Sequence, residues 1–229
     1  MRLFKSLCLL FLLLPVFALG QYFELPKEKK HEKISFQLIN NLIIIPVEVN
    51  GANLSFILDS GVSRPILFNL DDKDSLDIRN VSKIYLKGLG DGESVEALSS
   101  RENTFKIGNI ANKKQDIYVV LDKELNFSPK LGIPIHGIIG YDIFRDFVVE
   151  INYTGKNLKI HDPESYVYKQ RKNTETLPLT IENRKAYILA EAVIDNSDKV
   201  PVKLYTFGSP RVGHNPFAIQ SETSLNGIY

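Results

Sequence analysis

The sequence predicts an all-β protein, and three observations carry that prediction. Short apolar runs rich in Ile and Val recur along the chain, and turn-forming residues separate them. Beyond the amino-terminal apolar run, no long segment repeats its apolar residues every 3.6 positions, so long amphipathic helices are not expected. Hydrophobic residues make up 44% of the 229 residues, which is enough to build a core. Many short strands with regular turns are typical of a sandwich or a barrel.

The expected strands follow one another at short intervals. Asn50-Gly51 is a hairpin turn signal, and Gly108-Asn109 and residues 112–114 are further turn-like stretches. Residues 141–146 favour one or two helical turns, and Asp142 in the first of them would interact favourably with the helix dipole. The main strands are expected at 34–38, 42–49, 54–58, 83–89, 94–98, 104–107, 116–121, 147–151 and 157–160.

The amino terminus has the pattern of a secretory signal. Arg2 and Lys5 precede an apolar run over residues 7–17, and Ala18 and Gly20 offer the small residues that a signal peptidase reads. The run is shorter than the roughly 20 residues of a membrane span. Cleavage after residue 20 lowers the basic residues from 28 to 26 against 27 acidic ones, so the net charge changes from +1 to −1.

Charge and cysteine content exclude several classes of function. A net charge near zero argues against an electrostatic nucleic-acid binder. Cys8, the single cysteine, lies in the signal, so the mature chain has no disulfide, cysteine nucleophile or cysteine metal site. The histidines lack metal-ligand spacing, and neither a metal nor a cofactor is expected. An exported protein without disulfides fits the bacterial periplasm, cell envelope or extracellular medium.

The composition divides the chain into one long lobe and a shorter unit. A weak internal repeat relates segments 42–49 and 54–61 to segments 186–194 and 202–209, and Thr206 aligns with Asp59. The second unit therefore looks like the first part of another lobe. The expected segments are a signal at 1–20, a mobile leader at 21–32, a main lobe at 33–163, a linker at 164–176 and a partial second lobe at 177–229.

One segment carries candidate chemistry. Asp59 comes directly after the apolar strand 54–58, where a carboxylate is poorly solvated and has to be hydrogen-bonded, paired or functional. Ser60 can hydrogen-bond locally, and Gly61 permits a sharp backbone course. Asp-Ser-Gly is also a common turn tripeptide, so the three residues by themselves favour a turn.

The order of three elements resembles the retropepsin-like aspartic proteases, especially secreted bacterial aspartyl-protease-like proteins. Asp59-Ser60-Gly61 matches the active loop of that family, and Ile138-Ile139-Gly140 matches the apolar element beside the loop, which supports the cleft. The glycine-tipped hairpin matches the family's flap and consists of Gly88, Leu89, Gly90, Asp91 and Gly92. The resemblance covers about residues 33–163 and implies a closed barrel lobe, followed here by an incomplete second lobe.

The resemblance implies hydrolysis of an extended polypeptide by a water molecule that two carboxylates activate, without a metal or a cofactor. Asp59 supplies one carboxylate, and Thr206 in the repeat cannot supply the other. Two chains could pair so that each contributes one Asp59. The alternative is a truncated protease homologue that does not cleave and serves as a peptide-binding or structural barrel of the envelope.

Overall fold

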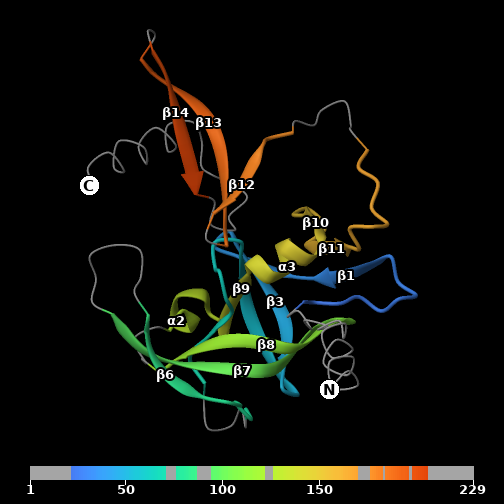
Figure 1. Ribbon diagram of the computed structural model, residues 1–229, viewed down its shortest axis with the longest axis vertical. Helices are drawn as coiled ribbons and strands as arrows, with labels where there is room; N and C mark the ends of the chain where they lie inside the picture. Colours follow the sequence, from blue (N-terminus) through green and yellow to red (C-terminus); the bar gives the residue numbers. More distant parts are fainter. Residues whose placement is uncertain are drawn as a thin grey trace, which may run out of the picture.

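The computed structural model describes residues 22–70, 76–86, 94–121, 126–169, 176–182, 184–195 and 198–205. The expected signal, the glycine tip of the hairpin at 88–92 and the chain from residue 206 onward lie outside the described residues. The described part is mostly β-structure, as the sequence predicts (Figure 1). None of its helices is long and apolar enough to cross a membrane.

Within the described residues, the main lobe contains eleven strands and two short helices. The strands are β1 (His31–Ser35), β2 (Gln37–Ile39), β3 (Leu42–Val49), β4 (Ala52–Asp59), β5 (Ile66–Leu67), β6 (Ser82–Leu86), β7 (Val95–Ile107), β8 (Ile110–Val120), β9 (Gly137–Gly140), β10 (Val148–Asn152) and β11 (Asn157–His161). The helices are α2 (Ser128–Leu131) and α3 (Tyr141–Asp146). The predicted helical turns at 141–146 are confirmed.

Six strands close into a barrel. Hydrogen bonds join β3, β4, β9, β5, β8 and β7 in that order, and the pairing of β7 with β3 completes the ring. The β4–β9 and β5–β8 pairs are parallel, and the other pairs of the ring are antiparallel. Closure leaves none of these six strands as an edge over the length at which the ring is paired. The expected closed barrel is therefore confirmed.

Residues that readily adopt positive φ form two hairpin turns of the barrel. Asn50 and Gly51 both have positive φ, 48° and 94°, as the two-residue turn between β3 and β4 requires. Gly108, with φ of 59°, turns β7 into β8. Both turns are where the sequence places them.

The structure corrects the expected strands at 94–98 and 104–107, which form the single long strand β7. The expected turn at residues 112–114 is also wrong, because these residues lie inside β8. Between the pairs Asn103–Gln115 and Phe105–Asn112, β8 carries one residue more than β7. The polar stretch is thus a β-bulge, in which the Lys114 N–H donates to the Asn112 side chain over 2.9 Å.

A second sheet packs beside the barrel and holds the amino-terminal segment. Its strand order is β1-β11-β10, with β1 and β11 antiparallel. Ile34 of β1 and Ile160 of β11 are buried in the same apolar cluster as the barrel residues Phe56 and Phe105. One core therefore spans the barrel and this sheet.

The expectation of a mobile leader over 21–32 is not what the structure shows for residues 22–32. Phe23 is only 3% exposed and belongs to the main core. Glu24 and Ala111 exchange two backbone hydrogen bonds, and β1 begins at His31. Burial of one aromatic ring and a short strand pairing fix a segment whose composition is otherwise polar.

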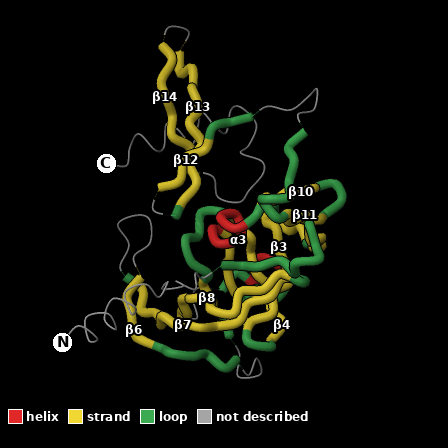
Figure 2. The backbone as a smooth tube through the Cα atoms, turned by 45° about the vertical axis from the view of Figure 1, so that its right-hand side comes forward, coloured by secondary structure: helices red, strands yellow, loops and turns green. Residues whose placement is uncertain are grey.

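The carboxy-terminal unit forms a third sheet of strands β12 (Leu179–Glu182), β13 (Lys185–Asp195) and β14 (Asp198–Tyr205). It is an antiparallel meander with the same order as β2-β3-β4. Figures 1 and 2 show it projecting from the end of the barrel at which α3 lies. Leu179 and Ile181 of β12 are more than half exposed, so this strand has no apolar cover within the described residues.

Candidate active site

Asp59 is the last residue of β4 and stands at the end of a buried strand. Phe56, Ile57 and Leu58 before it are at most 6% exposed, while Asp59 itself is half-buried. Its carboxylate accepts a hydrogen bond from the Gly61 N–H at 2.8 Å. Its backbone carbonyl accepts from the Val62 N–H at 3.1 Å. The chain therefore turns sharply after the strand, and the Asp-Ser-Gly loop holds the carboxylate in a defined orientation.

Strand β9 pairs with the end of β4 and packs closely against this loop. Ile138, Ile139 and Gly140 pair in parallel register with Ile57, Leu58 and Asp59. A Cβ atom on Gly140 would overlap the carbonyl group of Asp59. The Tyr141 N–H then donates to the Val62 carbonyl over 3.1 Å. The two elements that the sequence analysis singled out thus meet at backbone level, and only glycine fits at position 140.

The hairpin that would carry a flap is described only along its arms. β6 and β7 pair antiparallel from Ser82–Ser99 to Leu86–Val95. The pairing register leads directly toward the glycine tip, Gly88 to Gly92, which lies outside the described residues. Tyr85 and Val95 near the end of the arms are exposed at 65% and 39%.

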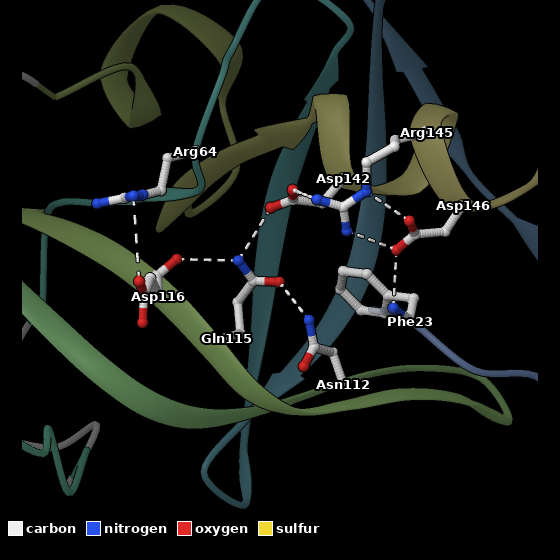
Figure 3. Close-up of polar contacts among 8 residues, drawn as sticks. All are labelled: Phe23, Arg64, Asn112, Gln115, Asp116, Asp142, Arg145 and Asp146. Atoms are coloured by element: carbon white, nitrogen blue, oxygen red, sulfur yellow. Dashed lines mark hydrogen bonds and ion pairs between the residues drawn. The ribbon is translucent and has the colours of Figure 1, made fainter. Parts of the chain in front are cut away.

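Behind the loop, a polar network joins α3 to β8 and to the amino-terminal segment (Figure 3). Arg145 binds Asp146 through two hydrogen bonds, from Nε at 2.5 Å and from Nη2 at 2.8 Å. Its Nη1 pairs with Asp142 at 3.1 Å. Asp142 also accepts from the Gln115 side-chain amide at 2.9 Å, and Gln115 accepts from Asn112 at 2.8 Å. Each buried charge of the network thus has a partner of opposite sign or a hydrogen-bond donor.

Both carboxylates of the network are nearly buried, with side-chain exposures of 6% for Asp142 and 3% for Asp146. Burial raises the pKa of Asp142, and the Asp146 charge acts in the same direction. The Arg145 charge and the Gln115 hydrogen bond lower the pKa but do not outweigh burial. In turn, hydrogen bonding to Asp146 raises the pKa of the Arg145 guanidinium. Arg145 is therefore the cation on which this buried network depends.

The sequence predicts Asp142 in a first helical turn, and the structure has it there, but its buried partners were not predicted. Asp142 and Arg145 are spaced i,i+3 on one helix, and such pairs lie side by side. Gln115 continues the inward alternation of Ile117 and Val119, so a polar residue occupies a core position. A buried polar side chain needs a hydrogen-bond partner. A glutamine at a core-facing position of the strand pattern could therefore have indicated the network.

Arg64, three residues beyond Gly61, is a second cation close to the loop. Its guanidinium lies 4.9 Å above the Tyr118 ring, and its Nη1 is 3.2 Å from the Tyr118 hydroxyl. Asp116 is 4.0 Å away. Among the described residues, no group of three His, Cys, Asp or Glu side chains is placed to hold a metal ion.

Comparison with known proteins gives two matches to the same class. Residues 45–143, from within β3 to within α3, match the sequence profile of the family described as aspartyl protease. Among solved structures, the chain is similar to the crystal structure of a retropepsin-like aspartic protease from Rickettsia conorii, with 16% identity and a TM-score of 0.37. That match covers 62% of this chain and 96% of the other. No curated protein matches the chain significantly.

Proposed function

We propose that this chain, whose residues 45–143 match the aspartyl protease family and whose strands form a closed barrel, is an exported aspartic-type endopeptidase. This proposal rests mainly on the position of Asp59. It ends a buried strand, accepts the Gly61 N–H and lies against Gly140. A carboxylate oriented in this way by backbone groups is suited to hold and pass a proton.

The proposed reaction needs a second carboxyl group that shares one proton with Asp59, since two adjacent carboxylates cannot both ionise cheaply. The ionised carboxylate takes a proton from water while the water oxygen attacks the peptide carbonyl carbon. The protonated carboxyl gives its proton to the carbonyl oxygen. The C–N bond then breaks as the amine nitrogen takes up a proton from the dyad.

The second carboxylate is proposed to come from another copy of the chain. Asp59 is the eighth residue of β4, and the eighth residue of the corresponding strand β14 is Tyr205. Alignment by sequence gives Thr206 instead. Neither residue carries a carboxylate, so the internal repeat does not complete a dyad. A homodimer that brings two Asp59 side chains together would complete it.

The proposed substrate is an extended polypeptide. The β6–β7 arms lead toward the glycine tip at 88–92, and a hairpin in that place could cover the substrate and bind it with strand-like hydrogen bonds. The amino-terminal pattern supports export to the periplasm, the cell envelope or the extracellular medium.

The test is cleavage of an unfolded protein by the purified mature chain across a range of acidic to neutral pH. We expect faster cleavage at acidic pH and its loss in Asp59→Asn. Asp77→Asn makes the same chemical change at an exposed carboxylate and is the matched control, which should keep its activity. Equal cleavage by Asp59→Asn and the unmodified chain would reject the assignment of Asp59.

A noncatalytic peptide-binding or structural barrel is the second candidate, and the absence of a carboxylate at Tyr205 and Thr206 favours it. It predicts binding of peptides without turnover at any pH. Proteolysis by the purified chain that a transition-state analogue of aspartic proteases inhibits would rule it out.

A further inference from the structure

The helix α3 begins directly on the candidate catalytic loop. Gly140, the residue before the helix, is the register partner of Asp59, and its backbone leaves no room for a Cβ. The first helical N–H, from Tyr141, donates to the carbonyl of Val62 in the loop. A displacement of α3 would therefore shift the backbone against which Asp59 is held.

α3 has little to hold it in place by itself. It is six residues long, and its first turn has no side-chain cap. Isolated helices of this length are unstable in water, so tertiary contacts have to fix it. Ile143 is its one buried apolar residue, and the other buried residue is Asp142. Polar contacts are thus a large share of what anchors this helix.

Arg145 makes those contacts in three directions. It pairs with Asp142 and with Asp146 on the helix, and its guanidinium lies 4.8 Å above the Tyr22 ring of the amino-terminal segment. Asp146 in turn accepts the Phe23 N–H at 2.8 Å, which joins the helix to a residue buried in the core. Asp142 joins the same helix to β8 through Gln115. Figure 3 shows Arg145 between the two carboxylates.

We propose that Arg145 is a positioning residue for Asp59. With Asp142 and Asp146, it clamps α3 between β8 and the segment Tyr22–Phe23, and through Gly140 and Tyr141 the clamp sets the Asp59 loop. The inference rests on the proposed function, because it assigns a role in preparing the catalytic carboxylate. Arg145 touches neither substrate nor reacting atoms in this role.

The test measures the loop directly in the full mature chain by NMR. The Gly61 amide donates to the Asp59 carboxylate, and the Tyr141 amide donates to Val62, so exchange of these two amide hydrogens reports on the loop and its contact with α3. The variant is Arg145→Gln. The matched control is Leu158→Ala, which opens a cavity at a fully buried residue of β11. Exchange is compared at equal global stability, adjusted with denaturant.

We expect the Gly61 and Tyr141 amides to exchange at least about tenfold faster in Arg145→Gln than in Leu158→Ala under those conditions, because the opening is local to the loop. The Gly61 amide chemical shift should also change in Arg145→Gln and stay unchanged in Leu158→Ala, since the hydrogen bond from this amide to the Asp59 carboxylate loosens only in the first variant. Equal exchange and equal Gly61 amide shifts in the two variants would overturn the proposal.

Arg145→Lys keeps the charge beside Asp142 but cannot make two parallel hydrogen bonds to Asp146. We expect exchange rates between those of the unmodified chain and Arg145→Gln, and this variant carries the test if Arg145→Gln does not fold. An Arg145→Lys chain with unmodified exchange would count against the role of the paired hydrogen bonds. None of these readouts requires turnover, so a chain that cleaves nothing can still show the clamp, and the two proposals fail separately.

Discussion

Gly140 and Asp142 are two residues apart at the start of α3, and the structure requires opposite things of them. Gly140 has to lack a side chain because the Asp59 carbonyl occupies that space. Asp142 has to keep its side chain, which binds Arg145 and Gln115 although it is 5% exposed. The first demand follows from close backbone packing, and the second from the loss of an ion pair with Arg145 and of an acceptor for the buried Gln115 amide.

Gly140→Ala is expected to destabilise the lobe by about 1–3 kcal/mol, since the new methyl group forces the Asp59 backbone to move. Denaturant unfolding measures the loss, and cleavage activity should fall with it. Gly132→Ala is the control: position 132 has open space and φ of 73°, so only the conformational penalty of about 1–2 kcal/mol applies. Retained activity in Gly140→Ala would contradict the tight contact at Asp59.

Asp142 should make stability depend on pH. Because burial raises its pKa in the folded state, the folded chain holds this proton more tightly than the unfolded chain. Its contribution to stability therefore falls as the pH rises above the unfolded aspartate pKa of about 4. Asp142→Asn should remove this fall. The measurement is the difference in unfolding free energy between the two chains from about pH 4 to pH 7.

Asp77→Asn, at an exposed carboxylate, is the control for that comparison and should change the pH dependence little. The difference in unfolding free energy between the unmodified chain and Asp142→Asn could instead stay constant with pH, or shift in favour of the unmodified chain as the pH rises. Either result would show that burial is not the dominant influence on the pKa of Asp142.

The elements that the sequence predicted best are those whose turns are encoded locally. Asn50-Gly51 and Gly108 fix two hairpins, because positive φ is cheap at these residues. Residues 112–114 carry the same kind of signal but form a bulge inside β8, since pairing with β7 on both sides overrides the local turn preference. Residues 22–32 look mobile by composition, yet Phe23 is buried because α3, far along the chain, offers it an acceptor and a core.

Removal of the Phe23 side chain tests whether the amino-terminal segment is part of the fold. Phe23→Ala should lower the free energy of unfolding by about 3–5 kcal/mol, the usual cost of emptying a buried phenylalanine site. Tyr22→Ala removes an exposed ring that contacts Arg145 and should cost about 0.5–1 kcal/mol. Thermal or denaturant unfolding gives both values. Similar small losses for the two variants would indicate that the segment is dispensable.

Taken as a whole, the molecule has one closed barrel and a meander that is not closed within the described residues. The β12–β14 unit repeats the order of β2–β4, but no described strand pairs with its outer edges. Leu177, Leu179 and Ile181 are exposed along one of those edges. The described residues thus contain the parts of one lobe, and in the proposed function a paired-carboxylate site depends on the association of two copies.

Dilution tests that dependence. If two copies each supply one Asp59, the rate of cleavage per chain should fall about tenfold for each tenfold dilution once monomers predominate, by mass action. A rate per chain that does not change over the range in which sizing shows dissociation would place a complete site within one copy.

The sequence by itself determined the β class, the hairpin turns, the helical turns at 141–146 and the family resemblance, because apolar periodicity and turn residues act over a few positions. The resemblance already placed Gly140 beside the Asp59 loop, but the tertiary structure alone decided that the Asp59 carbonyl leaves no room for a side chain there, that Gln115 meets Asp142, and that Phe23 is anchored by Asp146. These contacts join residues 27 to 123 positions apart. Barrel closure and long-range strand pairing bring these residues together. Local conformational preferences act over a few positions and cannot predict such contacts.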